Sequence, residues 1–220
     1  MRSKDKLEAF TWLLRLRQAC SHPANLDAHA GASRSQVVGR AAKDQELLDL
    51  LAENKAAGHQ TLVFSQFLPT LHSLRDAARG EGHRVFLYVG ETPREERDSL
   101  VKRFQAGEAD VLFMSLRAGG VGVNLTSADC VVHFDPWWNP ALESQATARA
   151  HRFGRRDTVR VVRLCYSDSV EERMIELHAT KRQLSEDLLG GPAADGTAGG
   201  GAEVSAGLSL DELRGLFQES

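Results

Sequence analysis

The chain has 220 residues, of which 42% are hydrophobic and 26% charged, and its formal net charge is −3. This length suits one domain with appendages or two small domains, and the near-neutral charge gives no overall sign of nucleic-acid binding. No apolar run approaches the roughly 18 residues that would span a bilayer, and no apolar signal core follows the first residues. We therefore expect a cytoplasmic chain, associated with the nucleoid in a prokaryote, or a nuclear one in a eukaryote.

Charge and cysteine are distributed unevenly along the chain. The segment from Arg149 to Arg163 holds six arginines and one acid, which makes a directed basic patch on a near-neutral protein. The three cysteines, Cys20, Cys130 and Cys165, have no metal-ligand spacing. We expect them to be reduced, mostly buried thiols, and we expect no metal site.

The first segment is predicted to be a helical lead-in. Residues 4–18 have a broad apolar face, and Cys20-Ser21-His22-Pro23 is expected to stop this helix, since proline disfavours helical backbone in the residue before it. Residues 27–42 are predicted to form an exposed, mobile connector. A second helix is predicted over 43–57, with Gly58 as its C-terminal stop.

Strands and helices alternate from Thr61 onward. The predicted strands are 61–64, 83–89, 110–114, 130–134 and 159–164, and the helices between them are 67–78, 93–105 (capped by Thr92) and 140–153. This alternation implies a parallel sheet with right-handed crossovers, and strands without polar alternation fit a sheet covered on both faces. The predicted fold class is α/β with a mainly parallel sheet.

The C-terminal part is predicted to contain a long helix over 170–188, a flexible glycine-rich linker over 189–207 and a short amphipathic helix within 208–220. The predicted organisation is therefore a helical lead-in and connector (1–42), a core domain (43–188), the linker and a tethered C-terminal helix.

A glycine-rich turn follows the third predicted strand. Gly119, Gly120 and Gly122 lie where ligands bind in open parallel sheets, beyond the carboxyl end of a strand, and a helix starting near Asn124 would favour an anion. The spacing matches neither a dinucleotide fingerprint nor a P-loop. The alternative interpretation is a tight turn that binds nothing.

The predicted helix after Pro140 carries a polar stripe. Gln145, Arg149 and Arg152 are four and three residues apart and would share one helix face. The planar fork of arginine suits phosphate oxygens. The alternatives are a solvated basic face or pairing with acids such as Glu171 and Glu172. Before this helix, Trp137 and Trp138 could stack on a nucleic acid, although one such aromatic is more often part of the core.

Five segments together resemble the second RecA-like lobe of the SWI2/SNF2 helicase family. They correspond to its motifs IV, V and VI, and the segment Leu16 to Pro23 resembles the family's LRQ-x-C-x-HP sequence before that lobe. The five segments are Val63-Phe64-Ser65-Gln66-Phe67, Tyr88-Val89-Gly90, Arg117 to Thr126, Phe134 to Pro140, and Gln145 to Arg155. The resemblance covers roughly residues 13–188, and the segment Leu208 to Phe217 resembles the family's common tail helix.

The resemblance implies a RecA-like three-layer lobe and an ATP-dependent double-stranded DNA translocase that uses ATP with Mg2+. Arg149 and Arg152 match the family's arginine fingers. The implied nucleotide-side residues are Gly120, Gly122, Asn124 and Gln145, and the candidates for DNA-backbone contact are Ser65, Gln66, Ser115, Arg117 and Trp138. The implied partners are double-stranded DNA, an N-terminal RecA-like lobe and a DNA-bound protein complex.

The sequence departs from the family's pattern at four positions. Phe153 replaces an aliphatic residue, and Ser21 replaces the usual asparagine. Arg155 replaces the usual glutamine of motif VI, and Ala148 stands where an acid or glycine is usual. These residues also contain no Walker A lysine and no DExx box. We therefore expect this chain alone neither to hydrolyse ATP nor to translocate. Such a chain would be a C-terminal fragment or a separately encoded half. The alternative functions are a stand-alone DNA-binding or regulatory module, a strand-separating helicase, and a small-molecule nucleotide-binding enzyme.

Overall fold

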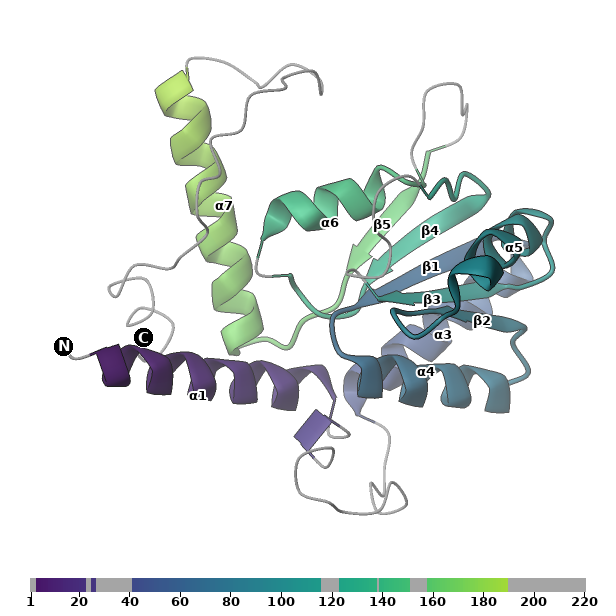
Figure 1. The fold of residues 1–220 in the computed structure, drawn as a ribbon. Coiled ribbons are helices and arrows are strands. Elements are labelled where there is room, and N and C mark those ends of the chain that lie inside the picture. The colour runs from purple at the N-terminus through teal and green to yellow at the C-terminus, as the bar shows by residue number, and fades with distance from the viewer. Residues whose placement is uncertain are drawn as a thin grey trace.

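A computed structural model describes residues 3–22, 25–26, 41–115, 123–137, 139–150 and 158–189. Its centre is a five-stranded, all-parallel sheet in the order β2-β3-β1-β4-β5 (Figure 1). The strands are β1 (Gln60–Ser65), β2 (Val85–Tyr88), β3 (Val111–Ser115), β4 (Ala128–His133) and β5 (Arg160–Arg163). The predicted parallel sheet is confirmed.

The sheet is central because its middle strands are apolar on both faces. In β1, Leu62, Val63 and Phe64 are all at most 1% exposed. Val63 lies opposite Phe113 of β3 on one side and Val132 of β4 on the other. A strand buried on both faces has no polar alternation, which is why continuous apolar runs predicted these strands.

Two pairs of helices cover the two faces of the sheet. Helices α3 (Ala42–Ala56) and α4 (Leu68–Gly80) pack with Val63, Phe113 and Val132 in one apolar cluster. Helices α5 (Arg94–Gln105) and α6 (Pro140–Thr147) contribute to the cluster on the opposite face, which contains Leu62 and Leu112. The structure is therefore the predicted three-layer α/β arrangement.

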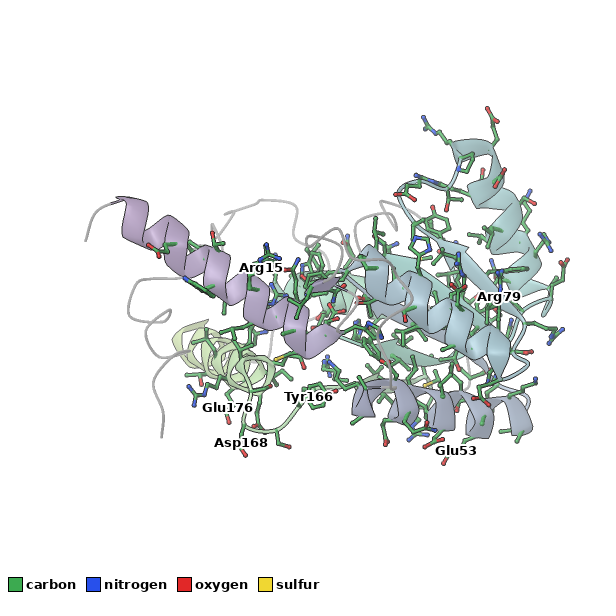
Figure 2. All side chains as sticks on the ribbon, turned by 90° about the horizontal axis from the view of Figure 1, so that it is seen from below. Arg15, Glu53, Arg79, Tyr166, Asp168 and Glu176 are labelled. Atoms are coloured by element: carbon green, nitrogen blue, oxygen red, sulfur yellow. The ribbon has the colours of Figure 1, made fainter. Side chains whose placement is uncertain are left out.

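Two further helices lie to one side of the three layers (Figure 1). Helices α1 (Ser3–Ser21) and α7 (Val170–Leu189) contact each other. Lys43, at the start of α3, forms an ion pair with Glu171 of α7 at 2.9 Å, and both side chains are buried. The Lys43 ammonium also lies 5.5 Å from the ring centroid of Tyr166, which stands between α7 and α3 (Figure 2). This pair fixes α7 to the core.

Several local predictions differ from the structure. Thr92 does not cap α5; its hydroxyl accepts a hydrogen bond from the Val89 amide at 3.0 Å, and Pro93 is the N-cap residue. Of the three free cysteines only Cys130 is buried, and Cys165 is exposed. Gly58, by contrast, has φ of +75° and ends α3 as predicted.

Of the predicted connector over 27–42, residues 27–40 lie outside the described residues, and Ala42 already belongs to α3. Of the predicted linker over 189–207, Leu189 still belongs to α7, and the rest, with the C-terminal helix, lies outside the described residues. Within the residues that are described, no helix is both long and apolar enough to cross a membrane.

Candidate functional site

The carboxyl ends of β1 and β4 form a topological switch point. These strands are neighbours, but β1 leads to α4 on one face of the sheet and β4 leads to α6 on the other. Ligands of open parallel α/β sheets bind at such a point. Ser65 and Gln66 lie at the end of β1, and Asp135 lies two residues after the end of β4, so this edge carries the polar groups expected of a site.

Asp135 is the buried centre of this edge. Its side chain is 1% exposed and accepts hydrogen bonds from the hydroxyl of Ser65, from the amide of Gln66 at 3.2 Å and from the hydroxyl of Ser21 at 3.4 Å. Burial raises the pKa of Asp135, and the hydrogen bonds from Ser65 and Gln66 oppose that rise. The carboxyl group therefore joins α1, β1 and β4 in one hydrogen-bonded network.

The peptide after Asp135 is held by side chains from three elements. The Pro136 carbonyl accepts hydrogen bonds from Arg17 at 3.0 Å and from Gln66 at 3.4 Å. The Trp137 amide donates to Glu143 of α6 at 2.7 Å, and the Trp137 side chain is 8% exposed. Trp137 is therefore the core member of the tryptophan pair, as one of the two was expected to be.

Arg149 lies in a turn and not on a long helix. The predicted helix over 140–153 is wrong in its extent, because α6 ends at Thr147 and residues 148–150 form a turn. The Arg149 carbonyl accepts a hydrogen bond from the Leu125 amide at 3.0 Å, which diverts the chain. Gln145 and Arg149 therefore do not share one helix face, and the structure brings Arg149 next to the Asn124–Leu125 segment instead.

The Arg149 guanidinium has the surroundings of an anion-binding group. It is half-buried, and its Nη1 atom is buried without a hydrogen-bond partner among the described residues. Burial lowers its pKa, an effect that Tyr88 partly opposes. The acid Glu171, an alternative partner, is instead paired with Lys43. A half-buried, unpaired cation is costly unless an anion meets it, so this arginine fits a phosphate group.

His133 connects β4 to the end of α6 near Arg149. Its Nε2 atom is hydrogen-bonded to the Thr147 hydroxyl at 3.0 Å, and its ring stacks on Phe64 with centroids 5.6 Å apart. Burial lowers the pKa of His133 from 6.5 to about 4. The imidazole is therefore neutral at physiological pH. It links the end of β4 to the last residue of α6, just before the turn that contains Arg149.

The lowered pKa of His133 predicts a pH-dependent stability. Between pH 6.5 and about 4 the unfolded chain binds a proton at this histidine that the folded chain does not, so stability falls as pH is lowered through that window. The loss from this group is expected to reach about 3 kcal/mol. Urea unfolding at pH 7 and pH 4.5 measures it, and His133→Gln, which keeps a hydrogen-bonding group but cannot titrate there, should lose less stability on acidification. Equal losses in both proteins would contradict this prediction.

The structure brings together only part of the predicted site. Arg149 lies next to the segment that contains Asn124, because the Leu125 amide donates a hydrogen bond to the Arg149 carbonyl. The Asn124 carbonyl accepts a hydrogen bond from Gln105 of α5 at 3.1 Å. Gln145 is exposed on α6. The predicted residues that lie outside the described ranges are Gly120, Gly122, Arg117, Trp138 and Arg152.

The candidates for DNA contact differ in accessibility. Gln66 is partly exposed, whereas Ser65 and Ser115 are buried. The Ser65 hydroxyl donates to Asp135 and accepts from the Phe67 amide at 3.1 Å. A DNA contact from Ser65 stays a prediction, and this buried hydroxyl, whose one proton is already donated to Asp135, offers no support for it.

Sequence reasoning assigned no role to Arg17, Asp135, His133 or Glu143. A carboxylate directly after a buried strand was a usable signal for Asp135. Nothing in the spacing signals the other three, and the partner of Arg17, the Pro136 carbonyl, is 119 residues away in the sequence.

The parallel sheet, its two covering helix layers and the polar switch point define a RecA-like α/β lobe. Residues 42–154 match the model of the helicase conserved C-terminal domain. The chain belongs to this family, in its SWI2/SNF2 branch. The resemblance inferred from the motifs is confirmed.

Two relatives illustrate the sequence similarity. An uncharacterized ATP-dependent helicase of Mycoplasma pneumoniae is 35% identical over 190 residues, which cover 86% of this chain and 18% of the relative. The human SWI/SNF-related matrix-associated actin-dependent regulator of chromatin subfamily A member 1 is 38% identical over 191 residues, or 84% of this chain and 18% of the relative. The chain thus spans under a fifth of the length of these curated relatives.

Two solved structures share the fold. The C-terminal domain of the Sulfolobus solfataricus SWI2/SNF2 ATPase has a TM-score of 0.70 and 30% identity, covering 98% of this chain and 83% of that one. The Sulfolobus solfataricus SWI2/SNF2 ATPase core in complex with double-stranded DNA has a TM-score of 0.73 and 30% identity, covering 98% of this chain and 43% of that one.

Proposed function

We propose that this chain is the C-terminal motor lobe of an ATP-dependent double-stranded DNA translocase that remodels or displaces DNA-bound proteins. The observation that carries the proposal is the half-buried Arg149 guanidinium, whose Nη1 atom lacks a partner among the described residues. The Arg149 main chain is held beside the Asn124–Leu125 segment by the hydrogen bond from the Leu125 amide to the Arg149 carbonyl. In this proposal Arg149 and Arg152 are the arginine fingers.

The proposed cofactor is ATP with Mg2+, held mainly by an N-terminal lobe that these residues do not include. ATP supplies the phosphoryl group, and the contribution of this chain is to orient and stabilise charge. Arg149 is suited to it because a partly desolvated guanidinium interacts more strongly with an anion than an exposed one does. Gly120, Gly122, Asn124 and Gln145 are the proposed nucleotide-side residues.

The proposed DNA surface combines the ends of β1 and β3 with the segments that follow β3 and β4 in the sequence. Gln66, Ser115, Arg117 and Trp138, with Ser65 supporting the loop, are the proposed residues. Contacts of this kind go to the phosphate backbone, so binding is expected to be independent of sequence and to weaken steeply with salt. The neighbouring Sulfolobus core was solved with double-stranded DNA, which supports a duplex as ligand.

The test is DNA-stimulated ATP hydrolysis by this chain alone and mixed with a matching N-terminal lobe. We expect activity only in the mixture, because the chain has no Walker A lysine and no DExx box. Arg152→Ala should abolish it. Robust turnover by the chain alone that survives Arg152→Ala would overturn the proposal. No activity in either sample, with salt-sensitive DNA binding retained, would favour a DNA-binding module.

A further inference from the structure

The peptide that joins Pro136 to Trp137 is held between a cation and an anion. Its carbonyl oxygen accepts a hydrogen bond from the Arg17 guanidinium at 3.0 Å, and its N–H donates to the Glu143 carboxylate at 2.7 Å. Arg17 is 9% exposed and Glu143 is 5% exposed. Two oppositely charged side chains, from α1 and α6, therefore act on one buried peptide unit.

This arrangement fixes the direction in which the peptide points. The peptide dipole has its negative end at the oxygen and its positive end at the N–H. In the observed orientation each end faces the opposite charge. A peptide turned through half a revolution would place its oxygen against Glu143 and its N–H against Arg17, and both contacts would be repulsive. Since charge-assisted hydrogen bonds are about twice as strong as neutral ones, the observed orientation is strongly preferred.

Both charged groups are themselves held in place. The second carboxylate oxygen of Glu143 accepts a hydrogen bond from Arg163 of β5 at 2.9 Å. The charge of Arg17 is balanced by Asp135 and Glu171, whose attraction opposes the lowering of the Arg17 pKa by burial. The Pro136 carbonyl also accepts a weaker hydrogen bond from Gln66 at 3.4 Å. The peptide is thus connected to α1, β1, α6 and β5.

The same face of α6 reaches β4 at a second point. Thr147 lies four residues after Glu143, which places both on one face of the helix. Its hydroxyl is bonded to His133, at the end of β4. Helix α6 is therefore attached at its start to the loop after β4 and at its end to β4 itself. A movement of the loop cannot be absorbed by α6 alone.

We infer that Arg17 and Glu143 are positioning residues that lock the Pro136–Trp137 peptide and thereby set the loop that continues into Trp138. The lock also joins α1 to this loop, so that a displacement of α1 changes the loop's geometry. The inference deepens the proposed function and rests on it for one step only, namely that this loop contacts double-stranded DNA.

Two readouts on the full chain test the inference. The first is hydrogen exchange of the Trp137 amide, followed by NMR. Glu143→Ala is expected to accelerate it about tenfold, the factor for losing one charge-assisted hydrogen bond. Glu143→Gln keeps a carbonyl oxygen for this amide and should change it by less than about threefold. The matched control is Glu53→Ala, an exposed glutamate in the C-terminal part of α3 (Figure 2), which should change nothing.

The second readout is affinity for a fluorescent DNA duplex at fixed salt. Glu143→Ala should weaken binding about tenfold and Glu143→Gln by clearly less. Should Glu143→Ala fail to fold, Arg17→Met takes its place, because it removes the donor to Pro136 while keeping an apolar stem of similar length. It should accelerate Trp137 exchange as well.

The outcomes separate the inference from the proposed function. Unchanged Trp137 exchange in Glu143→Ala, or in Arg17→Met where that variant replaces it, overturns the positioning role. Accelerated exchange with unchanged DNA affinity overturns its link to DNA binding. Absence of DNA binding by the unaltered chain contradicts the proposed function, while the exchange measurement still decides whether the two charged residues lock the peptide.

Discussion

Arg149→Ala is expected to lower DNA-stimulated ATP hydrolysis by the mixed lobes by at least about 10³-fold, the lower end of the range for a lost arginine finger. The reason is structural as well as chemical. The guanidinium is half-buried beside Tyr88 and its Nη1 atom lacks a partner among the described residues, which leaves this N–H free to meet an anion. The loss should appear mainly in kcat, because the interaction strengthens as charge develops on the transferring phosphoryl group.

Two further variants make this result interpretable. Arg149→Lys keeps the charge but loses the planar fork, so its activity should lie between those of the unaltered chain and Arg149→Ala. Arg79→Ala, on α4 of the opposite helix layer (Figure 2), removes an exposed arginine and should leave turnover unchanged. If Arg149→Ala kept activity within about threefold of the unaltered mixture, the arginine-finger assignment would be wrong, since such a finger contributes orders of magnitude.

The sheet could be predicted from the sequence because a strand that is buried on both faces appears in the sequence as a continuous apolar run. Strands β1, β3 and β4 are continuous apolar runs, and their order of alternation with helices requires parallel pairing. Even β5, whose residues are largely exposed or half-buried, was found because it follows the same alternation. Periodicity therefore carried the prediction of the parallel sheet, whereas the strand order and its switch point come from the structure.

The local predictions that are wrong failed because of contacts that form only in the folded chain. The end of α6 was misplaced because the bond from the Leu125 amide to the Arg149 carbonyl joins two segments that lie 24 residues apart, and helix propensity contains no information about it. Thr92 is a good N-cap residue by type, yet its hydroxyl is taken by the Val89 amide. The lock on the Pro136–Trp137 peptide was missed for the same reason, because it exists only after α1 and α6 have packed against the sheet.

Lys43→Met is expected to destabilise the chain by about 3–5 kcal/mol, the cost of leaving one partner of a buried ion pair alone. The Glu171 carboxylate accepts both hydrogen-bond contacts from Lys43, at 3.0 and 2.9 Å, and is 1% exposed. Methionine preserves an apolar stem of similar length and removes the ammonium, which also lies over the Phe134 and Tyr166 rings, so the effect reports the lost charge. Lys55→Met, which removes a lysine whose side chain is 43% exposed, is the matched control and should cost under about 1 kcal/mol.

The pH dependence and a second substitution identify the cause of that loss. Burial already raises the pKa of Glu171, and removing Lys43, which lowers it, must raise it further. A folded-state pKa above the unfolded one means that the folded chain binds more protons, so the variant should lose stability as pH rises from 4.5 toward that raised pKa. Urea unfolding at pH 5 and pH 8 should therefore show the larger deficit in the free energy of unfolding at pH 8.

Adding Glu171→Gln to Lys43→Met should recover most of the lost stability, because no charge is then buried alone. The glutamine carbonyl can still accept the hydrogen bond from the Tyr166 amide. If the double variant were as unstable as Lys43→Met, the ion pair would contribute nothing, and the contacts of Lys43 with the two rings would be what holds α7 against the core.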